Sequence, residues 1–163
     1  MTLAVARAGL EAVADADRLI REAADWLAAK GEPLWGPEEI SYDDLVAVAR
    51  KGELVLGRVD GETAACLYLH DEDTLFWPEA NPGEAFYVHR LAVARKFAGR
   101  GLAHAMLEWA EEEARAMGRA FLRLDCVPRP KLVALYQSAG FVPVDPGPVM
   151  VGRHLVIRQQ KPV

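Results

Sequence analysis

The sequence predicts a single α/β domain around a mixed sheet, and three observations lead to this fold class. A strand, a short basic loop and a long amphipathic helix follow one another within residues 86–117. Two strand-like runs are joined by Asp60-Gly61, a dipeptide typical of tight β-hairpins. The chain has 163 residues, which suits one domain with a sizeable core, and no linker or internal repeat divides it. We therefore expect one domain over residues 1–163.

The N-terminal part predicts a strand followed by a helix. Residues 2–7 have the pattern of a short strand. Asp15 or Asp17 is expected to cap the helix, because an aspartate side chain accepts hydrogen bonds from the N–H groups of a first turn. Gly31 is expected to end it. The apolar face of this helix consists of Leu19, Ile20, Ala23, Ala24 and Leu27.

A second helix and a hairpin follow. Ser41 is expected to cap the second helix, with Asp44 at the reciprocal position, and Gly52 is expected to end it. The hairpin strands are residues 54–59 and 63–70. An acidic, proline-containing loop then leads to the strand–loop–helix stretch.

The stretch at residues 86–117 begins as a strand and continues as a helix. On the strand, alternate residues face opposite sides, with His89 and Leu91 on one side and Arg90 and Ala92 on the other. The helix carries one broad apolar stripe, as expected for a helix packed on a sheet. The stripe consists of Leu102, Ala103, Met106, Leu107, Trp109, Ala110 and Ala114.

The C-terminal part predicts three more strands and one helix. The expected strands are residues 120–126, 141–144 and 149–158, the last two forming a hairpin. Pro130 suits the first turn of a helix, and Gly140 closes that helix. With the earlier elements, this makes about seven strands and four helices.

Composition excludes several classes of protein. The net charge of −5 argues against nucleic-acid binding through a broad basic surface. No apolar run is long enough to span a membrane, and the first residues lack the pattern of a signal peptide. Cys66 and Cys126 do not have the spacing of a disulfide framework. We therefore expect a cytoplasmic protein with no nucleic-acid or membrane partner.

The loop between strand and helix has the chemistry of an anion-binding site. Glycines let the backbone approach a ligand closely, and the N–H groups of the first helical turn point out toward it. Arg95, Lys96 and Arg100 add positive charge. A Walker loop is excluded because no Lys-Ser or Lys-Thr occurs, and the dinucleotide fingerprint is excluded because His104 stands at its third glycine.

These residues resemble the pyrophosphate loop of the GCN5-related N-acetyltransferase (GNAT) family, written [RQ]-x-x-G-x-[GA]. The match is A-G-R-G-L-A at residues 98–103, with Ala98 in place of the family's arginine or glutamine. The preceding L-A-V strand and the later segments L-R-L-D-C and L-V-A-L-Y-Q-S-A-G-F extend the resemblance over residues 86–141.

The resemblance implies a fold and a co-substrate. The family's sheet is mixed and mostly antiparallel, splayed at its centre where the thioester of acyl-CoA enters. Acetyl-CoA is the implied co-substrate, its pantetheine arm pairing with the backbone of the L-A-V strand, where an N–H polarises the thioester carbonyl. The implied cofactor-binding residues are Leu91, Ala92, Val93, Ala98, Gly99, Arg100, Gly101, Leu102, Ala103 and Arg129. Of these, Arg129 stands where relatives usually have asparagine.

Two residues are predicted to move protons, and each has an ordinary structural alternative. Tyr136 occupies the place where the family often has a tyrosine near the CoA sulfur, and a phenol can protonate a departing thiolate. It could equally be a core tyrosine. His89 is the candidate base, because imidazoles titrate near neutral pH, but a strand histidine is often simply packed. Tyr87, Glu84 and Asp125 are alternatives for the base.

The resemblance therefore implies an N-acetyltransferase in which a primary amine attacks acetyl-CoA directly. The acceptor, a small molecule or a peptide amine, depends on variable loops, here around Trp35, Trp77 and Pro146, although either tryptophan could instead cover the core. No metal site is expected, because the histidines lack ligand spacing. The off-pattern Ala98 and Arg129 keep open a non-catalytic acyl-CoA sensor. A protein that binds another phosphate ligand and an oligomeric state such as a homodimer also stay open.

Overall fold

The computed structural model describes residues 1–163, which form two compact units. The first unit comprises residues 1–69 and 90–106, and the second comprises residues 70–89 and 107–163. Strand β4 (Ala85–Val93) and helix α3 (Leu102–Ala116) each contribute residues to both units.

Antiparallel strands form the sheet of the first unit. Strand β1 (Leu3–Arg7) pairs with β2 (Leu54–Val59), and β2 pairs with β3 (Glu62–His70). The connection between β2 and β3 has Asp60 and Gly61 at φ 50° and 79°, as a two-residue hairpin turn of type I′ requires. The hairpin expected from the sequence is therefore confirmed.

Helices α1 (Val13–Ala29) and α2 (Tyr42–Arg50) also belong to the first unit. The cap of α2 is as expected, since the Ser41 hydroxyl accepts a hydrogen bond from the N–H of Asp44 at 3.2 Å. The expected cap of α1 is wrong. The chain enters α1 through a 3-10 turn (Leu10–Ala12) and the helix begins at Val13, so Asp15 lies within its first turn and no side chain caps it.

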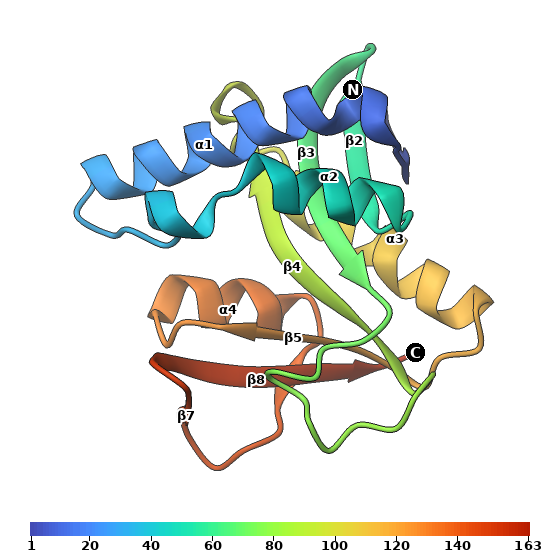
Figure 1. Cartoon of the computed structure of the whole chain (residues 1–163), viewed down its shortest axis with the longest axis vertical. Helices are drawn as coiled ribbons and strands as arrows, with labels where there is room; N and C mark the ends of the chain where they lie inside the picture. Colours follow the sequence, from blue (N-terminus) through green and yellow to red (C-terminus); the bar gives the residue numbers. More distant parts are fainter. The chain divides into compact units, whose positions relative to one another are not determined.

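The core of the first unit lies on both faces of its strands. One buried cluster joins α1 and α2 to β2, with Ile20, Leu45 and Leu56 among its members. Figure 1 shows both helices along the same side of β2 and β3. A second cluster packs Phe97 and Leu102, which lead into α3, against the strands. The start of α3 is therefore fixed to the sheet by apolar side chains.

The second unit contains β5 (Phe121–Cys126), β6 (Val142–Pro143), β7 (Val149–Val151) and β8 (His154–Pro162). The single strand expected at residues 149–158 is wrong, because the chain turns at Gly152, which has φ 57°, and folds β7 back on β8. Strand β8 pairs with β5, β6 and β7, all antiparallel.

The strands follow the order β1-β2-β3-β4-β5-β8-β6, with β7 on β8, and this gives an eight-stranded, mostly antiparallel sheet. The one parallel pair is β4 with β5, and its register runs only from Ala85↔Phe121 to Val88↔Leu124. Both strands continue beyond this point. The pairing of β4 with β5 thus ends inside both strands, as expected for a sheet that splays there.

Helix α4 (Pro130–Ser138) completes the four α-helices. Pro130 occupies its first turn, where a missing N–H costs no hydrogen bond, and Gly140 follows it at φ 95°. None of the helices is long and apolar enough to cross a lipid bilayer.

Both cysteines are free and buried. Burial raises the pKa of the Cys66 thiol to about 12, partly offset by a backbone hydrogen bond from Ala92. Burial also raises the pKa of Cys126 to about 11, although the Gln159 side chain moderates the effect. Neither thiol is therefore suited to act as a nucleophile.

Candidate functional site

Two glycines shape the loop that precedes α3. A short 3-10 turn (Arg95–Phe97) follows β4, and Gly99 and Gly101 then adopt φ values of 75° and 77°. Side chains other than glycine rarely adopt this left-handed conformation. Apart from the glycine itself and its two chain neighbours, no residue has a heavy atom within 4 Å of the place that a Cβ would occupy at either position. The loop is therefore built from two open, left-handed glycines on either side of Arg100.

The same loop ends at the N-terminus of α3. The N–H of Ala105 donates to the carbonyl of Gly101 at 3.1 Å, so the helical hydrogen bonds begin at Gly101. The first amides of an α-helix have no acceptor within the helix, and the helix dipole places positive charge there. This end of α3 consequently suits an anionic group, as the sequence predicted for residues 98–103.

The three basic side chains of the loop have different surroundings. The Arg95 guanidinium lies 3.5 Å from the ring centre of Trp26 in α1. Lys96 forms an ion pair with Glu62 at 2.7 Å. Arg100 is exposed and lies 5.6 Å from the centre of the Phe97 ring. Arg100 is therefore the loop cation best placed to meet a ligand, while Arg95 and Lys96 are partly engaged by the protein.

Strand β4 changes conformation just before residues 91–93. Arg90 has φ 52°, which interrupts the extended backbone, so the alternation expected through residue 93 does not continue unchanged. Two contacts hold this residue: its Nη2 donates to the Glu39 carbonyl at 2.8 Å, and its guanidinium lies 5.1 Å from the Trp35 ring. The strain is thus compensated by side-chain contacts next to Leu91.

Trp35 is half-buried and packs against the core of the first unit. This agrees with the alternative that the tryptophan covers the core. Its contact with Arg90 nevertheless links the segment between α1 and α2 to the strained residue of β4.

His89 is held by a carboxylate that no sequence pattern predicted, that of Asp73. Its Nε2 lies 2.8 Å from Oδ2 of Asp73, in the segment between β3 and β4. Burial raises the pKa of Asp73, but the hydrogen bond and charge of His89 and the N–H of Phe76 outweigh it, so this pKa lies below its ordinary value. An ionised carboxylate can only accept hydrogen bonds, so Nε2 carries the proton.

A second carboxylate lies near the other ring nitrogen. Oδ1 of Asp125, on β5, is 4.0 Å from Nδ1 of His89, which is longer than a direct hydrogen bond. With the proton fixed on Nε2, a neutral ring offers its lone pair at Nδ1. His89 is therefore arranged as an oriented imidazole with Nδ1 near the carboxyl group of Asp125.

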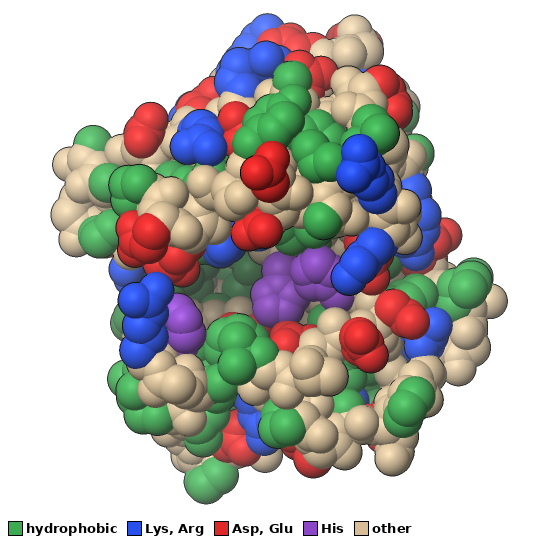
Figure 2. Space-filling view, viewed as in Figure 1, with side chains coloured by type: hydrophobic (Ala, Val, Ile, Leu, Met, Phe, Trp, Pro, Cys, Tyr) green, Lys and Arg blue, Asp and Glu red, His purple; other side chains and the backbone are tan.

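Ring contacts extend this group of polar residues. The ring centres of His70 and His89 are 5.2 Å apart, and Phe76 lies 6.2 Å from His89 and 6.1 Å from His154. Figure 2 shows histidine side chains gathered beside acidic ones on the displayed face. Aromatic rings and carboxylates together favour a cationic ligand.

Asp73, His89 and Asp125 each offer a metal-ligating atom within 4.8 Å of the others. The two carboxylates approach different nitrogens of the imidazole, however, which suits an oriented histidine better than a shared ion. These three residues show no ligand spacing in the sequence, because they lie on separate parts of the chain. That the protein needs no metal stays a prediction.

Tyr136 lies on α4 in the second unit. Burial raises the pKa of its phenol, and the negative charges of Cys126 and Asp125 would raise it further. Its ring also packs edge-on against Phe141 at 6.1 Å. The phenol therefore stays protonated well above neutral pH, as a proton donor must. Asp125 acts electrostatically on Tyr136 and lies near His89, so it is common to both predicted proton-transfer residues.

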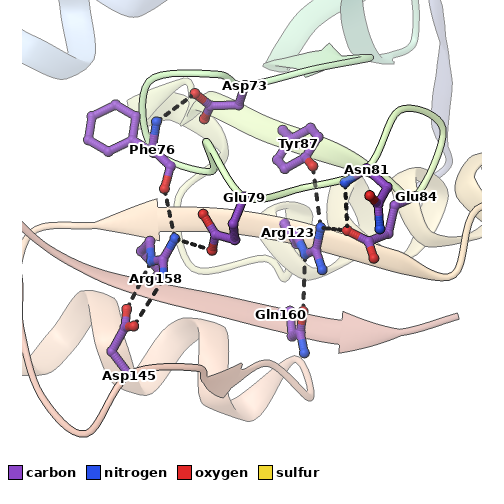
Figure 3. A network of polar contacts seen from close by, with 10 residues as sticks. All are labelled: Asp73, Phe76, Glu79, Asn81, Glu84, Tyr87, Arg123, Asp145, Arg158 and Gln160. Atoms are coloured by element: carbon purple, nitrogen blue, oxygen red, sulfur yellow. Dashed lines mark hydrogen bonds and ion pairs between the residues drawn. The ribbon is translucent and has the colours of Figure 1, made fainter.

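The alternatives to His89 have other partners. Tyr87 is buried, and its hydroxyl accepts a hydrogen bond from Nη1 of Arg123 at 3.3 Å. Glu84 pairs with the same nitrogen at 2.7 Å, and this hydrogen bond lowers the pKa of Glu84. Both residues belong to the polar network in Figure 3. Neither is arranged as a base.

Trp77 is buried, with 3% of its surface exposed, which agrees with the alternative that this tryptophan covers the core. The guanidiniums of Arg123 and Arg158 lie 4.8 and 4.7 Å from its ring centre. Arg158 also forms two hydrogen bonds with the carboxylate of Asp145, at 2.9 and 3.0 Å. Trp77 is thus a core residue that anchors the segment between β3 and β4.

Arg129 lies at the N-terminus of α4, where its backbone N–H donates to the carbonyl of Val127 at 2.7 Å. The backbone is extended there, as expected for the residue before a proline. Its predicted contact with a cofactor stays a prediction.

Comparison with known proteins identifies the family of this chain. Residues 20–141 match the model of the Acetyltransferase (GNAT) family, and this range includes the glycine loop, His89 and Tyr136. The chain belongs to the GNAT family. A curated relative, the uncharacterized N-acetyltransferase YesJ of Bacillus subtilis (strain 168), is 34% identical over 115 residues. That match covers 67% of this chain and 64% of YesJ.

Solved GNAT structures share the fold. A GNAT-family acetyltransferase of Listeria monocytogenes 4b F2365 has a TM-score of 0.84 at 23% identity, covering 99% of this chain and 95% of its own. The protein yncA of Salmonella typhimurium, solved with its cofactor acetyl-CoA, has a TM-score of 0.74 at 16% identity, with coverage of 99% of this chain and 94% of its own. These structures confirm the predicted fold class.

The pairing of Asp145 with Arg158 predicts a pH dependence of stability. The hydrogen bond from Arg158 holds the pKa of the Asp145 carboxyl below the ordinary value for aspartate. Near pH 4 the unfolded chain therefore binds more protons than the folded protein does. The contribution of Asp145 to the free energy of unfolding is complete above the ordinary aspartate pKa of about 4, and it is lost as the pH falls through the pKa of Asp145 in the folded protein.

We expect Asp145→Asn to lower the free energy of unfolding at pH 7 by about 2 kcal/mol, the worth of hydrogen bonds to a charged group. The variant should also lose less stability than the native protein between about pH 5 and pH 3. Urea unfolding across this range measures both effects, with Asp25→Asn on the exposed side of α1 as control. Parallel pH curves for the native protein and Asp145→Asn would contradict the assignment.

Proposed function

We propose that this GNAT protein is an N-acetyltransferase that transfers an acetyl group from acetyl-CoA to a primary amine. The observation that carries the proposal is the pair of open, left-handed glycines, Gly99 and Gly101, at the N-terminus of α3. In a chain of the GNAT family, this loop has the shape and polarity to bind the pyrophosphate of coenzyme A. The acetyl-CoA bound by the Salmonella typhimurium protein supports the same co-substrate here.

Backbone groups bind the coenzyme in this proposal. The amides of residues 98–103 hold the pyrophosphate, with Arg100 adding charge, and Arg129 contributes from the start of α4. The pantetheine arm pairs with residues 91–93, one of whose N–H groups donates to the thioester carbonyl. Such a fixed donor stabilises the oxyanion of the tetrahedral intermediate. The left-handed Arg90 next to these residues sets the direction of their amides.

The chemistry is a direct attack. The amine nitrogen bonds to the acetyl carbon, the carbon–sulfur bond breaks, and CoA leaves as a thiolate. Nδ1 of His89 accepts the proton that the amine loses, because Asp73 keeps the other ring proton on Nε2. Tyr136 protonates the thiolate, and burial keeps its phenol in the acid form that this step needs.

The acceptor that fits these residues is an amine that is cationic in solution. Asp73 and Asp125 place two carboxylates around His89, and the ring of Phe76 lies beside them. A cation bound there would be held electrostatically until it gives one proton to water, and the neutral amine that remains then attacks. The proposal covers small-molecule and peptide amines and includes no metal. A cytoplasmic location and a homodimer stay predictions.

The direct test of the proposal is turnover. Acetyl-CoA and a panel of primary amines, from small polyamines to lysine peptides, should release CoA thiol and acetylated amine in equal amounts. EDTA should leave the rate unchanged, because no step uses a metal. Binding of acetyl-CoA with no thiol release for any amine would favour the non-catalytic sensor, and binding of nucleotides alone would exclude both.

Gly101→Ala should weaken coenzyme binding. A Cβ at φ 77° costs about 1 kcal/mol or more of backbone strain and pushes the loop away from its conformation. We expect the Kd of CoA, measured by calorimetry, to rise about tenfold. The matched control is Gly61→Ala, because Gly61 has φ 79° and equally open surroundings but lies in the β2–β3 turn. Equal losses of affinity in both variants would contradict a binding role for the loop.

Tyr136→Phe should lower kcat by about 100-fold, the usual contribution of a general acid, with the KM for acetyl-CoA little changed. Because the phenol pKa is raised, Tyr136 stays protonated below about pH 10, so the loss should be constant from pH 6 to about pH 9. Rate measurements at several pH values check this. A loss that varies with pH in that range, or an unchanged kcat, would contradict proton donation.

A further inference from the structure

We infer that Arg158 is a positioning residue for His89 and acts on it through the β3–β4 segment, residues 71–84. For catalysis, the inference rests on the proposed role of His89 as the base. Arg158 lies on β8, far along the chain from both His89 and the segment. Three hydrogen-bonded links connect it to the imidazole, and Figure 3 shows the first two of them.

The segment needs such support because it contains no helix or strand. Its backbone therefore lacks the regular hydrogen bonds that fix a strand or helix, and side chains must hold it instead. Trp77 provides one anchor, since it is buried and two guanidiniums lie 4.8 and 4.7 Å from its ring centre. The segment is thus attached at defined points rather than along its length.

Arg158 fixes the part of the segment nearest to His89. Its Nη1 donates to the carbonyl of Phe76 at 3.0 Å and to Glu79 at 2.6 Å. Asp145 accepts two further hydrogen bonds and orients the guanidinium. These hydrogen bonds raise the pKa of Arg158 further above an already high value, so the group is always charged. Arg158 therefore holds Phe76 with a rigid fork of donors.

Phe76 transmits this constraint to Asp73. Its carbonyl is bound by Arg158, and its N–H donates to Oδ1 of Asp73 at 3.1 Å. The N–H of Trp77 also donates to the carbonyl of Asp73 at 2.9 Å, which closes a tight turn. One oxygen of Asp73 is therefore fixed by the turn, and Oδ2 points to Nε2 of His89 at 2.8 Å.

The consequence concerns the proton on the imidazole. A neutral histidine can carry its proton on either nitrogen, and the partner of one nitrogen decides which. If the Phe76 carbonyl were released, the turn that orients Asp73 would loosen and Nε2 would lose its fixed acceptor. A share of the molecules would then carry the proton on Nδ1, which is the nitrogen that must accept a proton from the amine.

The chain provides a matched control in Arg123. Its guanidinium lies at nearly the same distance from Trp77, 4.8 Å against 4.7 Å for Arg158. Its partners are Glu84, at the other end of the segment, Gln160 on β8 and the hydroxyl of Tyr87 on β4. Substitution of Arg123 thus removes a comparable set of buried contacts and the stability that they contribute, while the hydrogen bond between Phe76 and Asp73 remains.

The first test reads the imidazole directly and does not depend on turnover. Nitrogen NMR of the His89 ring, assigned with His89→Gln, should show the proton on Nε2 in the native protein at about pH 9, where an ordinary imidazole is neutral. Arg158→Gln should give a mixture of both tautomers, and Arg123→Gln should keep the native signals. If Arg158→Gln does not fold, Arg158→Lys carries the test, because it keeps the charge but lacks the fork.

The second test is kinetic. Arg158→Gln should lower kcat about tenfold, as expected for a misplaced catalytic group, and leave the KM for acetyl-CoA within about twofold. In the double variant, Arg158→Gln should lower kcat no further than Asp73→Asn does alone, because both substitutions break the same hydrogen-bonded link to His89. For Arg123→Gln combined with Asp73→Asn, the fold-loss of kcat in the double variant should equal the product of the two single losses.

The outcomes separate the two proposals. Native tautomer signals in Arg158→Gln, or a multiplicative loss in the Arg158→Gln and Asp73→Asn double variant, would overturn the positioning role. Unchanged turnover in His89→Gln would instead overturn the role of His89 as base, while the NMR result would still decide whether Arg158 orients its ring.

Discussion

In the second unit, two arginine side chains pack against the buried indole of Trp77. They hold the β3–β4 segment, residues 71–84, which contains no helix or strand. Arg123 lies on β5 and Arg158 lies on β8, and both guanidiniums approach the ring of Trp77. Charges in such surroundings must be paired, and each guanidinium has a carboxylate partner. Breaking one of these pairs would leave a charge without compensation. The inferred positioning of Asp73, and with it of His89, depends on the Arg158 part of this arrangement.

The coenzyme loop depends on a different kind of constraint. Its conformation follows from Gly99 and Gly101, which adopt backbone angles that other residues avoid, and from the helix that begins directly after them. No distant side chain is needed to give it this shape. Binding of coenzyme A is therefore proposed to rest on local backbone geometry, whereas the proposed acid–base chemistry rests on contacts between distant residues.

This difference explains what the sequence could predict. The Asp60-Gly61 hairpin, the Ser41 cap and the glycine loop each depend on residues a few positions apart, and the structure has all three. Asp73 was missed because its partner His89 is 16 residues away, and Arg158 because the Phe76 carbonyl is 82 residues away. No local pattern records such pairs.

Two further differences have similar causes. The separation of β7 from β8 was missed because the apolar residues on both sides of Gly152 read as one continuous strand. The left-handed Arg90 was missed because its conformation is compensated by Trp35 and Glu39, which lie on another segment. Alternation along a strand indicates which side a residue faces, but it gives no warning of a local irregularity.

The buried cysteines have a practical consequence for measuring this reaction. Reagents that report free CoA react with thiolates. With pKa values of about 12 and about 11, Cys66 and Cys126 stay protonated in neutral buffer and are shielded from solvent. A colour change in such an assay would therefore come from the released coenzyme, with negligible background from the folded enzyme even at high protein concentration.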